Sequence, residues 1–199
     1  MLRIVKIILI LSILSATGCL RATDWAGIVQ VRTFHGAGTG VVVARRNGDY
    51  IIATARHVVL WERYVRIDRA TGEVIALDAA TDVALIRLPD TGQRYDVRTL
   101  ADAVEGEPCS ALGWAYDSER RAWPMLYRGW IVAPEFSRNV LVANTGGFPG
   151  LSGGPLLNAA GQVVGLMRGP AQVDSRTIFD STVLFTPAGA IRAAIARAT

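Results

Sequence analysis

Apolar residues gather in short stretches along most of the chain, and turn-forming residues separate these stretches at regular spacing. Stretches of this length that are rich in valine, isoleucine and leucine are typical of β-strands. The first half is expected to form strands over 25–33, 40–44, 50–53, 64–68, 74–77 and 83–88. The second half is expected to form strands over 108–116, 125–134, 140–145, 156–157, 163–168 and 182–185. Short strands joined by turns favour an all-β fold, either a barrel or a sandwich.

Near the end of the sequence, the apolar residues recur with a different period. Residues 187–198 have the spacing of an amphipathic helix, which Pro187 can start. Its apolar stripe consists of Ile191, Ala194, Ile195 and Ala198. A polar stretch over 89–100 divides the strands into two groups. We assign them to a first barrel at about 26–90 and a second at about 101–186.

The first 18 residues are expected to be a signal peptide and no part of the fold. Arg3 and Lys6 precede an apolar stretch over 7–14, which is too short to span a bilayer as a mature helix. Small residues then lead to Cys19, and this arrangement resembles a bacterial lipobox, whose cysteine is lipidated and becomes the new N-terminus. We therefore expect export to the bacterial cell envelope, in the periplasm or on the outer surface, with a lipid anchor on Cys19. Ordinary secretion with cleavage after a small residue and retention as an uncleaved anchor are the alternatives.

Residues 19–25 would then form a tether before a folded domain over 26–199. The 199 residues, 51% of them hydrophobic, suit one compact domain or two packed barrels of about 80–90 residues each. Loss of the signal peptide would leave 19 of the 21 basic residues against 17 acidic ones, a net charge of +2. This charge is too small, and the basic residues are too scattered, to indicate a nucleic-acid partner.

Cysteine and histidine are too few and too far apart for a metal site. With Cys19 lipidated, only Cys109 keeps a thiol, so no disulfide within the chain is expected. Cys109 lies on a predicted buried strand, where a cysteine behaves as a small hydrophobic residue and not as a reactive thiol.

The hexapeptide Gly150-Leu151-Ser152-Gly153-Gly154-Pro155, followed by an apolar strand, is the most informative motif in the chain. Its glycines allow a tight turn that presents the Ser152 hydroxyl and frees backbone N–H groups to bind a carbonyl oxygen. A serine hydroxyl is a poor nucleophile at neutral pH, so it needs a base within hydrogen-bond reach and a group to orient that base.

Two histidines and two aspartates are candidates for these partners. His57 lies just past a predicted buried strand, and a short helical turn follows it. His35 lies in a glycine-rich loop, which we interpret as an ordinary surface position. Asp82 leads directly into the strand Val83–Leu88, where a carboxylate can be desolvated and aimed, and we expect it to orient His57. Asp78, four residues earlier in the same loop, is the alternative.

These motifs resemble the trypsin-like (chymotrypsin-fold) serine peptidases, and most closely the bacterial HtrA/Deg-type protease domain. The shared patterns are T-A-x-H at His57, D-x-A-L-I-R-L at Asp82 and G-x-S-G-G-P at Ser152, in that order. The similarity covers about residues 26–197, with weaker matches over 38–43 and 128–133.

The resemblance implies a fold of two six-stranded antiparallel β-barrels with a C-terminal helix. It also implies a serine endopeptidase that acts on protein or peptide substrates without a cofactor, while the oligomeric state stays open. Ser152 would be the nucleophile, His57 the base and Asp82 its orienting carboxylate. The backbone N–H groups of Gly150 and Ser152 would form the oxyanion hole. By the same likeness, the substrate pocket would be bounded by Asn144, Gly146, Gly147, Leu166, Met167 and Arg168.

Several features depart from the family pattern. Leu151 stands where digestive relatives carry an aspartate that receives a newly cleaved N-terminus, so we expect no such activation step. Asn144 replaces an aspartate common in HtrA-type relatives. The chain also ends soon after the protease domain, which would leave no room for a PDZ module. Leu166 and Met167 suggest a preference for small or medium apolar P1 residues over arginine or lysine.

Two other functions are compatible with the same motifs. A protease-like fold that has lost activity would act as a binding protein at the cell envelope. A non-proteolytic acyl hydrolase could use the same three residues. The order His, Asp, Ser argues against the α/β-hydrolase arrangement, which runs Ser, Asp, His.

Overall fold

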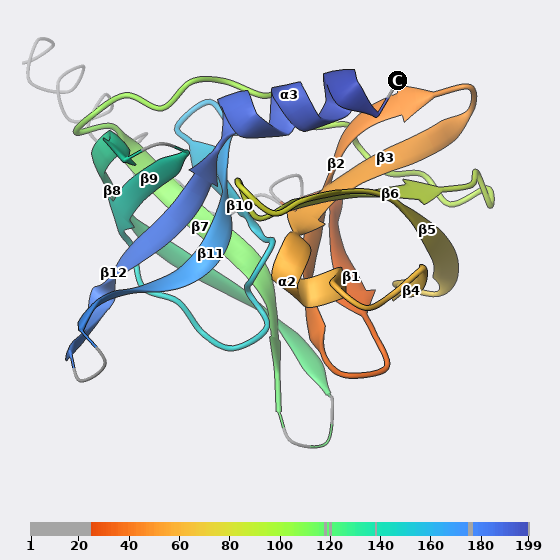
Figure 1. The fold of residues 1–199 in the computed structure, drawn as a ribbon, viewed down its shortest axis with the longest axis horizontal. Coiled ribbons are helices and arrows are strands. Elements are labelled where there is room, and N and C mark those ends of the chain that lie inside the picture. Colours follow the sequence, from red (N-terminus) through yellow and green to blue (C-terminus); the bar gives the residue numbers. More distant parts are fainter. Residues whose placement is uncertain (1–24, 118, 120, 138, 175–176, 199) are drawn as a thin grey trace, which may run out of the picture.

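The computed structural model describes residues 25–117, 119, 121–137, 139–174 and 177–198. They form two closed antiparallel barrels that lie side by side, with a helix across both (Figure 1). Each barrel has six strands, so the predicted all-β fold with two barrels and a C-terminal helix is confirmed. The predicted signal peptide and the predicted lipidation site Cys19 lie outside the described residues.

The first barrel has the strand order β1-β2-β3-β6-β5-β4. Its strands are β1 (Ile28–Arg32), β2 (Ala37–Arg46), β3 (Asp49–Ala55), β4 (Tyr64–Ile67), β5 (Ala70–Asp78) and β6 (Val83–Leu88). A single helical turn, α2 (Arg56–Val59), follows β3 directly. Because β3 pairs with β6 and not with β4, the end of β3 and the start of β6 become neighbours in space.

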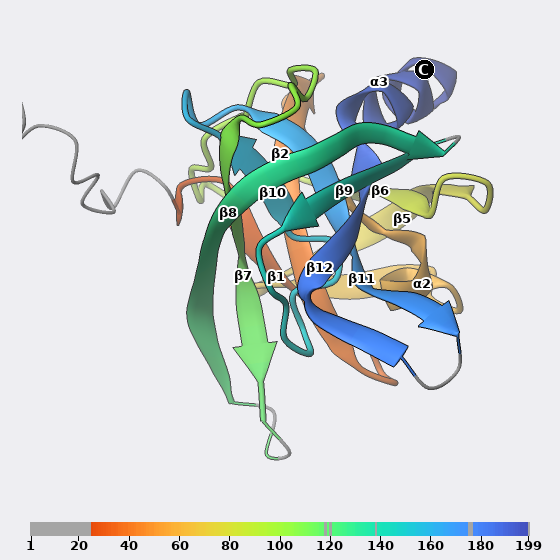
Figure 2. The ribbon, with the colours of Figure 1, turned by 90° about the vertical axis from the view of Figure 1, so that its left-hand side faces the viewer.

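The second barrel has the order β10-β11-β12-β9-β8-β7. Its strands are β7 (Pro108–Tyr116), β8 (Ala122–Ser137), β9 (Val140–Asn144), β10 (Pro155–Asn158), β11 (Val163–Asp174) and β12 (Thr177–Pro187). The long strand β8 curves along one side of this barrel (Figure 2). The segment between β9 and β10 carries Ser152.

Several strands extend further than their sequence pattern predicts. β2, β5 and β12 span 37–46, 70–78 and 177–187, where 40–44, 74–77 and 182–185 were expected. β8 spans 122–137, where 125–134 was expected, because both of its ends carry mixed polar and exposed residues that blur the alternation. β11 continues past Gly169 and Pro170, where 163–168 was expected. Its pairing with β12 shifts register on both sides of these two residues, and such irregularities let a strand accommodate a proline.

Each barrel has its own apolar core, and a further buried layer joins the barrels to α3 (Ala188–Arg197). Val41 and Leu85 reach this layer from the first barrel, Leu166 from the second and Ile191 from the helix. All four side chains are at most 1% exposed. Burial of this apolar area, at about 25 cal/mol per Å², holds the two barrels together along the cleft between them.

None of the helices in the described part of the chain is long and apolar enough to cross a membrane.

Candidate active site

Antiparallel pairing of β3 with β6 brings the candidate base and its carboxylate together. Ala55, the last residue of β3, lies opposite Val83, the first residue of β6. His57 follows Ala55 by two residues, and Asp82 directly precedes Val83. A backbone hydrogen bond from Arg56 N to Asp82 O, 2.9 Å long, continues the pairing by one step. Strand register within one barrel therefore places these two side chains.

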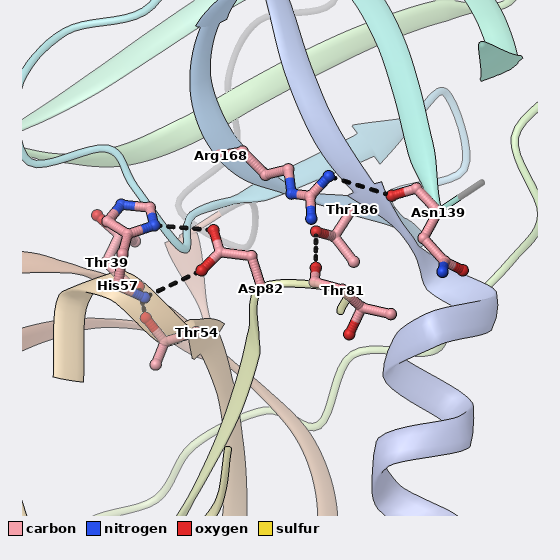
Figure 3. A network of polar contacts seen from close by, with 8 residues as sticks. All are labelled: Thr39, Thr54, His57, Thr81, Asp82, Asn139, Arg168 and Thr186. Atoms are coloured by element: carbon pink, nitrogen blue, oxygen red, sulfur yellow. Dashed lines mark hydrogen bonds and ion pairs between the residues drawn. The ribbon is translucent and has the colours of Figure 1, made fainter. Parts of the chain in front are cut away.

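Asp82 binds His57 through both carboxylate oxygens (Figure 3). Oδ1 accepts a hydrogen bond from the backbone N of His57 at 3.0 Å, and Oδ2 lies 2.8 Å from Nδ1 of the ring. A carboxylate at Nδ1 favours the tautomer that carries its proton there, which leaves Nε2 free to accept one. Figure 3 shows this second ring nitrogen on the side away from Asp82.

Opposing influences set the ionisation of Asp82. Burial is the largest, and it raises the pKa because it disfavours the charged form. Hydrogen bonds from His57 and the charges of His57 and Arg168 lower the pKa, and together they outweigh burial. The pKa of Asp82 therefore lies below its ordinary value, so the side chain is a carboxylate at neutral pH and can stabilise an imidazolium.

Two glycines of the Ser152 turn are required by its geometry. Gly150 and Gly153 have φ angles of 100° and 81°, in the left-handed region that favours glycine. A Cβ atom on Gly153 would lie 2.2 Å from Thr54 Oγ1. The glycine thus lets the turn that presents Ser152 press directly against the first barrel.

Both barrels hold this turn in place. Thr39 of β2 donates its backbone N–H to Ser152 O and its hydroxyl to Gly150 O, each at 2.9 Å. Gly153 N donates to Met167 O of β11 at 2.8 Å. Because the Thr39 side chain is fully buried, these bonds are shielded from competition with water.

The backbone around Ser152 leaves two amide groups unused. Within the described residues, the N–H groups of Gly150 and Ser152 have no protein acceptor, whereas the intervening Leu151 N donates to Phe148 O at 3.1 Å. Two free N–H groups beside a serine hydroxyl form a set of donors that could bind a developing oxyanion.

Ser152 and His57 line the same pocket, whose other lining residues all belong to the first barrel. No hydrogen bond joins their side chains in the described part of the chain. Catalytic hydrogen bonds in empty sites are often long and tighten only when a substrate is present. His35 is exposed, as expected for a surface position, but it also lines this pocket with Trp61, which the sequence pattern did not suggest.

A second groove begins at Ser152 and contains half of the predicted pocket residues. Its lining consists of Gly147, Phe148, Pro149, Ser152, Met167, Arg168, Gly169 and Pro170. Leu166 instead lies in the buried layer between the barrels. Asn144 pairs with Trp130 and Thr182 at the end of β9, and neither it nor Gly146 is among the residues that line the groove.

The alternative carboxylate, Asp78, lies away from His57. Its Oδ1 accepts a hydrogen bond from Ala80 N at 3.0 Å, and its other oxygen forms an ion pair with Arg197 of α3. Asp78 thus caps the turn before Asp82.

Thr186 is a residue near the site that the sequence pattern did not indicate. Its hydroxyl donates to Thr81 O at 2.5 Å beside Asp82. A lone polar residue at the end of a predicted apolar strand was the one signal for it.

The described residues hold no group of three or more histidine, cysteine, aspartate or glutamate side chains that could bind a metal ion. Burial, with a smaller effect from Glu107, raises the pKa of the Cys109 thiol to about 12. A thiol of this kind is scarcely ionised at neutral pH, so it is a poor nucleophile.

A family model described as "Trypsin-like peptidase domain" matches residues 38–166, which contain the His57, Asp82 and Ser152 motifs. The chain belongs to this family. The likeness predicted from the sequence motifs is thereby confirmed. Within the trypsin-like peptidase domain family, the chain is 30% identical to the serine protease Do-like HtrA of Bacillus subtilis over 156 residues, and to that of Lactobacillus helveticus over 147 residues. These matches cover 67% and 65% of this chain but 33% and 34% of the relatives, so the chain spans about a third of their length.

Solved structures share the fold at lower sequence identity. A serine endoprotease from Yersinia pestis superposes with a TM-score of 0.70 at 19% identity, covering 87% of this chain and 62% of that one. The inactive form of a protease from M. tuberculosis gives a TM-score of 0.65 at 23% identity and covers 88% of both chains. Proteins of distant sequence therefore share the fold of this chain.

Proposed function

We propose that the chain is a serine endopeptidase that hydrolyses peptide bonds of protein substrates. In this proposal, Ser152 Oγ attacks the scissile carbonyl while His57 Nε2 takes the hydroxyl proton and later gives it to the leaving amine. Asp82 keeps the proton of the imidazole on Nδ1 and stabilises the imidazolium that forms. The N–H groups of Gly150 and Ser152 bind the oxyanion of the tetrahedral intermediate, where one such donor is worth about 10²–10³ in turnover.

The observation that carries this proposal is the two-point contact between Asp82 and His57 in the pocket that Ser152 also lines. An aspartate with a merely structural role has no need to bind the Nδ1 atom of a half-exposed histidine. The lowered pKa of Asp82 and the two unused N–H groups of the Ser152 turn agree with the same chemistry.

The P1 side chain of the substrate would enter the groove beside Ser152. Gly147, Phe148, Met167 and Pro170 give this groove a mainly apolar wall, and its lining contains no carboxylate. We therefore propose a preference for small or medium apolar P1 residues over arginine or lysine. A panel of peptides that differ only at P1 tests this preference, and faster cleavage after arginine or lysine would contradict it.

Export and lipid anchoring at the cell envelope are part of the proposal and rest on the sequence of the first 19 residues. Replacement Cys19→Ser should move the protein from the membrane to the soluble fraction. Unchanged retention in the membrane fraction would favour an uncleaved anchor. A wild-type protein that is already soluble would favour ordinary secretion.

Labelling by a fluorophosphonate probe tests the central claim. The wild-type chain should react, and Ser152→Ala should not, because the probe phosphonylates an activated serine hydroxyl. Ser110→Ala, on strand β7 of the second barrel, is the matched control and should label at the wild-type rate. A folded wild-type protein that does not react would support a catalytically silent binding protein. Turnover of simple esters but not of casein would support an acyl hydrolase.

A further inference from the structure

The loop that carries Asp82 adopts a backbone conformation that must be held in place. Asp82 has a φ angle of 56°, which is left-handed and uncommon for a residue with a side chain. The direction of its carboxylate depends on this angle, because φ sets how the Cα substituents are turned relative to the preceding peptide group. The proposed catalysis needs that carboxylate within hydrogen-bond distance of His57 Nδ1.

The peptide groups on the two sides of Asp82 are anchored from different barrels. The following one is held by its carbonyl, which accepts a hydrogen bond from Arg56 N of the first barrel at 2.9 Å. The preceding one is held by the Thr81 carbonyl, which accepts the hydroxyl of Thr186 at 2.5 Å (Figure 3). Thr186 lies near the end of β12, 105 residues further along the chain.

The anchor from Thr186 is buried and has no substitute nearby. Thr186 is fully buried and Thr81 is 7% exposed, so water does not compete for this bond. Among the described residues, this is the one hydrogen bond that joins the second barrel to residues 79–82. The Thr81 hydroxyl is also buried but has no hydrogen-bond partner there, so it does not hold the loop.

We infer that Thr186 is a positioning residue, whose hydroxyl fixes the Thr81–Asp82 peptide group and thereby aims the Asp82 carboxylate at His57. This inference rests on the proposed function for its catalytic consequence. It means that the second barrel helps to align Asp82 with His57, although both of these residues belong to the first barrel. The contact also links the alignment of the carboxylate to the way in which the barrels pack.

Threonine-to-valine replacements at the two ends of the contact give a matched test. Thr186→Val removes the donor with little change of shape, whereas Thr81→Val removes the partnerless hydroxyl and keeps the carbonyl that accepts. We expect Thr186→Val to lower kcat about 10- to 100-fold, the range that a small misplacement of catalytic groups produces. KM should stay within about twofold, since the substrate groove is untouched. Thr81→Val should keep kcat within about twofold of the wild-type value. Thr186→Ser keeps the hydroxyl, so its kcat should be close to that of the wild type and well above that of Thr186→Val.

A second measurement separates positioning from stability. The proton on Nδ1 of His57, hydrogen-bonded to Asp82, should give a low-field NMR resonance, which Thr186→Val should shift or broaden and Thr81→Val should leave in place. If Thr186→Val does not fold, Thr186→Ala, which also lacks the hydroxyl but fills less space, takes its place. A lower melting temperature with unchanged kcat and an unchanged resonance would show that Thr186 is structural only and would overturn the inference.

The proposed function and this inference can fail separately. A folded wild-type chain that hydrolyses no peptide and binds no fluorophosphonate contradicts the proposed function, and the NMR resonance then still tests whether Thr186 positions Asp82. A wild-type chain that reacts, with Thr186→Val and Thr186→Ala reacting equally fast, contradicts the inference alone.

Discussion

The two barrels contribute to the candidate site in different ways. The first barrel holds His57 and Asp82 through the register of two paired strands, so their contact depends on local pairing between β3 and β6. The second barrel supplies Ser152 on a turn whose shape depends on contacts with both barrels, through Thr39 of β2 and Met167 of β11. The half with His57 and Asp82 is built mainly within one barrel, with one added contact from Thr186 of the second, and the half with Ser152 is built between barrels.

This difference shows which part of the site is more easily displaced by a mutation. Strand register cannot shift by one residue without turning every side chain of the strand to the opposite face, so the pairing of His57 with Asp82 is strongly specified. The position of Ser152 relative to His57 has no such protection. It depends on a few hydrogen bonds and on glycines that allow close approach.

The largest effect is expected from a change in the half built within the first barrel. Asp82→Asn keeps the shape of the side chain but removes the charge and favours the wrong imidazole tautomer, so kcat should fall about 10⁴-fold. KM should change little, because Asp82 does not line the substrate groove. Steady-state hydrolysis of a peptide substrate measures both constants. Asp78→Asn is the control, since Asp78 lies in the same loop but pairs with Arg197, and it should lose far less activity. Equal losses in the two variants would contradict the assignment of Asp82.

The Ser152 turn, which is built between the barrels, should be destabilised by added bulk at Gly153. In Gly153→Ala, the added Cβ would meet Thr54 Oγ1 at 2.2 Å and would also have to adopt a positive φ, so the free energy of unfolding should fall by about 2–4 kcal/mol. Urea denaturation measures this loss. Gly48→Ala has a similar φ of 91° but no atom within 4 Å, so it should cost only about 1 kcal/mol. Similar losses for both variants would mean that backbone strain, and not the close contact between barrels, makes Gly153 necessary.

A smaller effect is expected from the threonine that links the barrels. Thr39→Val loses a donor to Gly150 O and an acceptor for Trp114 N, which should lower the free energy of unfolding by about 1–3 kcal/mol. The Ser152 turn should also become less well fixed, so fluorophosphonate labelling should slow by about tenfold. Thr71→Val, at an exposed position of β5, is the control and should change neither quantity. A stability loss without slower labelling would show that Thr39 supports the fold but not the nucleophile.

The smallest effect concerns pH. Because the pKa of Asp82 is lower in the folded chain than its ordinary value of 3.8, its carboxylate stabilises the fold above about pH 4, and this contribution is lost as the pH falls through the folded pKa. The difference in unfolding free energy between wild type and Asp82→Asn should therefore shrink below pH 4. Arg168→Met removes one of the charges that lower this pKa, so the stabilisation by Asp82 should be smaller and its loss should be complete at a higher pH. Denaturation series at several pH values measure both curves, and identical curves for wild type and Arg168→Met would exclude the charge effect.

The sequence was sufficient to single out the candidate residues of the site because each of them stands in its own local motif. The motifs around His57, Asp82 and Ser152 each combine a reactive residue with the strand or turn that presents it, so their identity did not require knowledge of distant contacts. The alternation of apolar residues likewise predicted the strands of both barrels and the C-terminal helix α3, although β2, β5, β8, β11 and β12 run further than predicted.

What the sequence could not provide were contacts between residues far apart in the chain. Thr186 meets Thr81 only because the barrels pack as they do, and no local pattern reports that packing. Leu166 and Met167 looked equally suited to a pocket wall, but neighbouring residues of a strand face opposite sides. Leu166 therefore enters the layer between the barrels, while Met167 reaches the groove.

The apolar layer shared by both barrels and α3 has a consequence for how the chain becomes a folded protein. The side chains in that layer bury one another, among them Val41, Leu85, Leu166 and Ile191. If the chain were cut in the polar connection near residue 95, each of the two fragments would therefore expose apolar surface to water. Neither fragment should fold stably by itself, and their co-expression should be needed to recover a native-like complex. In the cell, a partly synthesised chain would thus depend on chaperones until α3 has emerged from the ribosome.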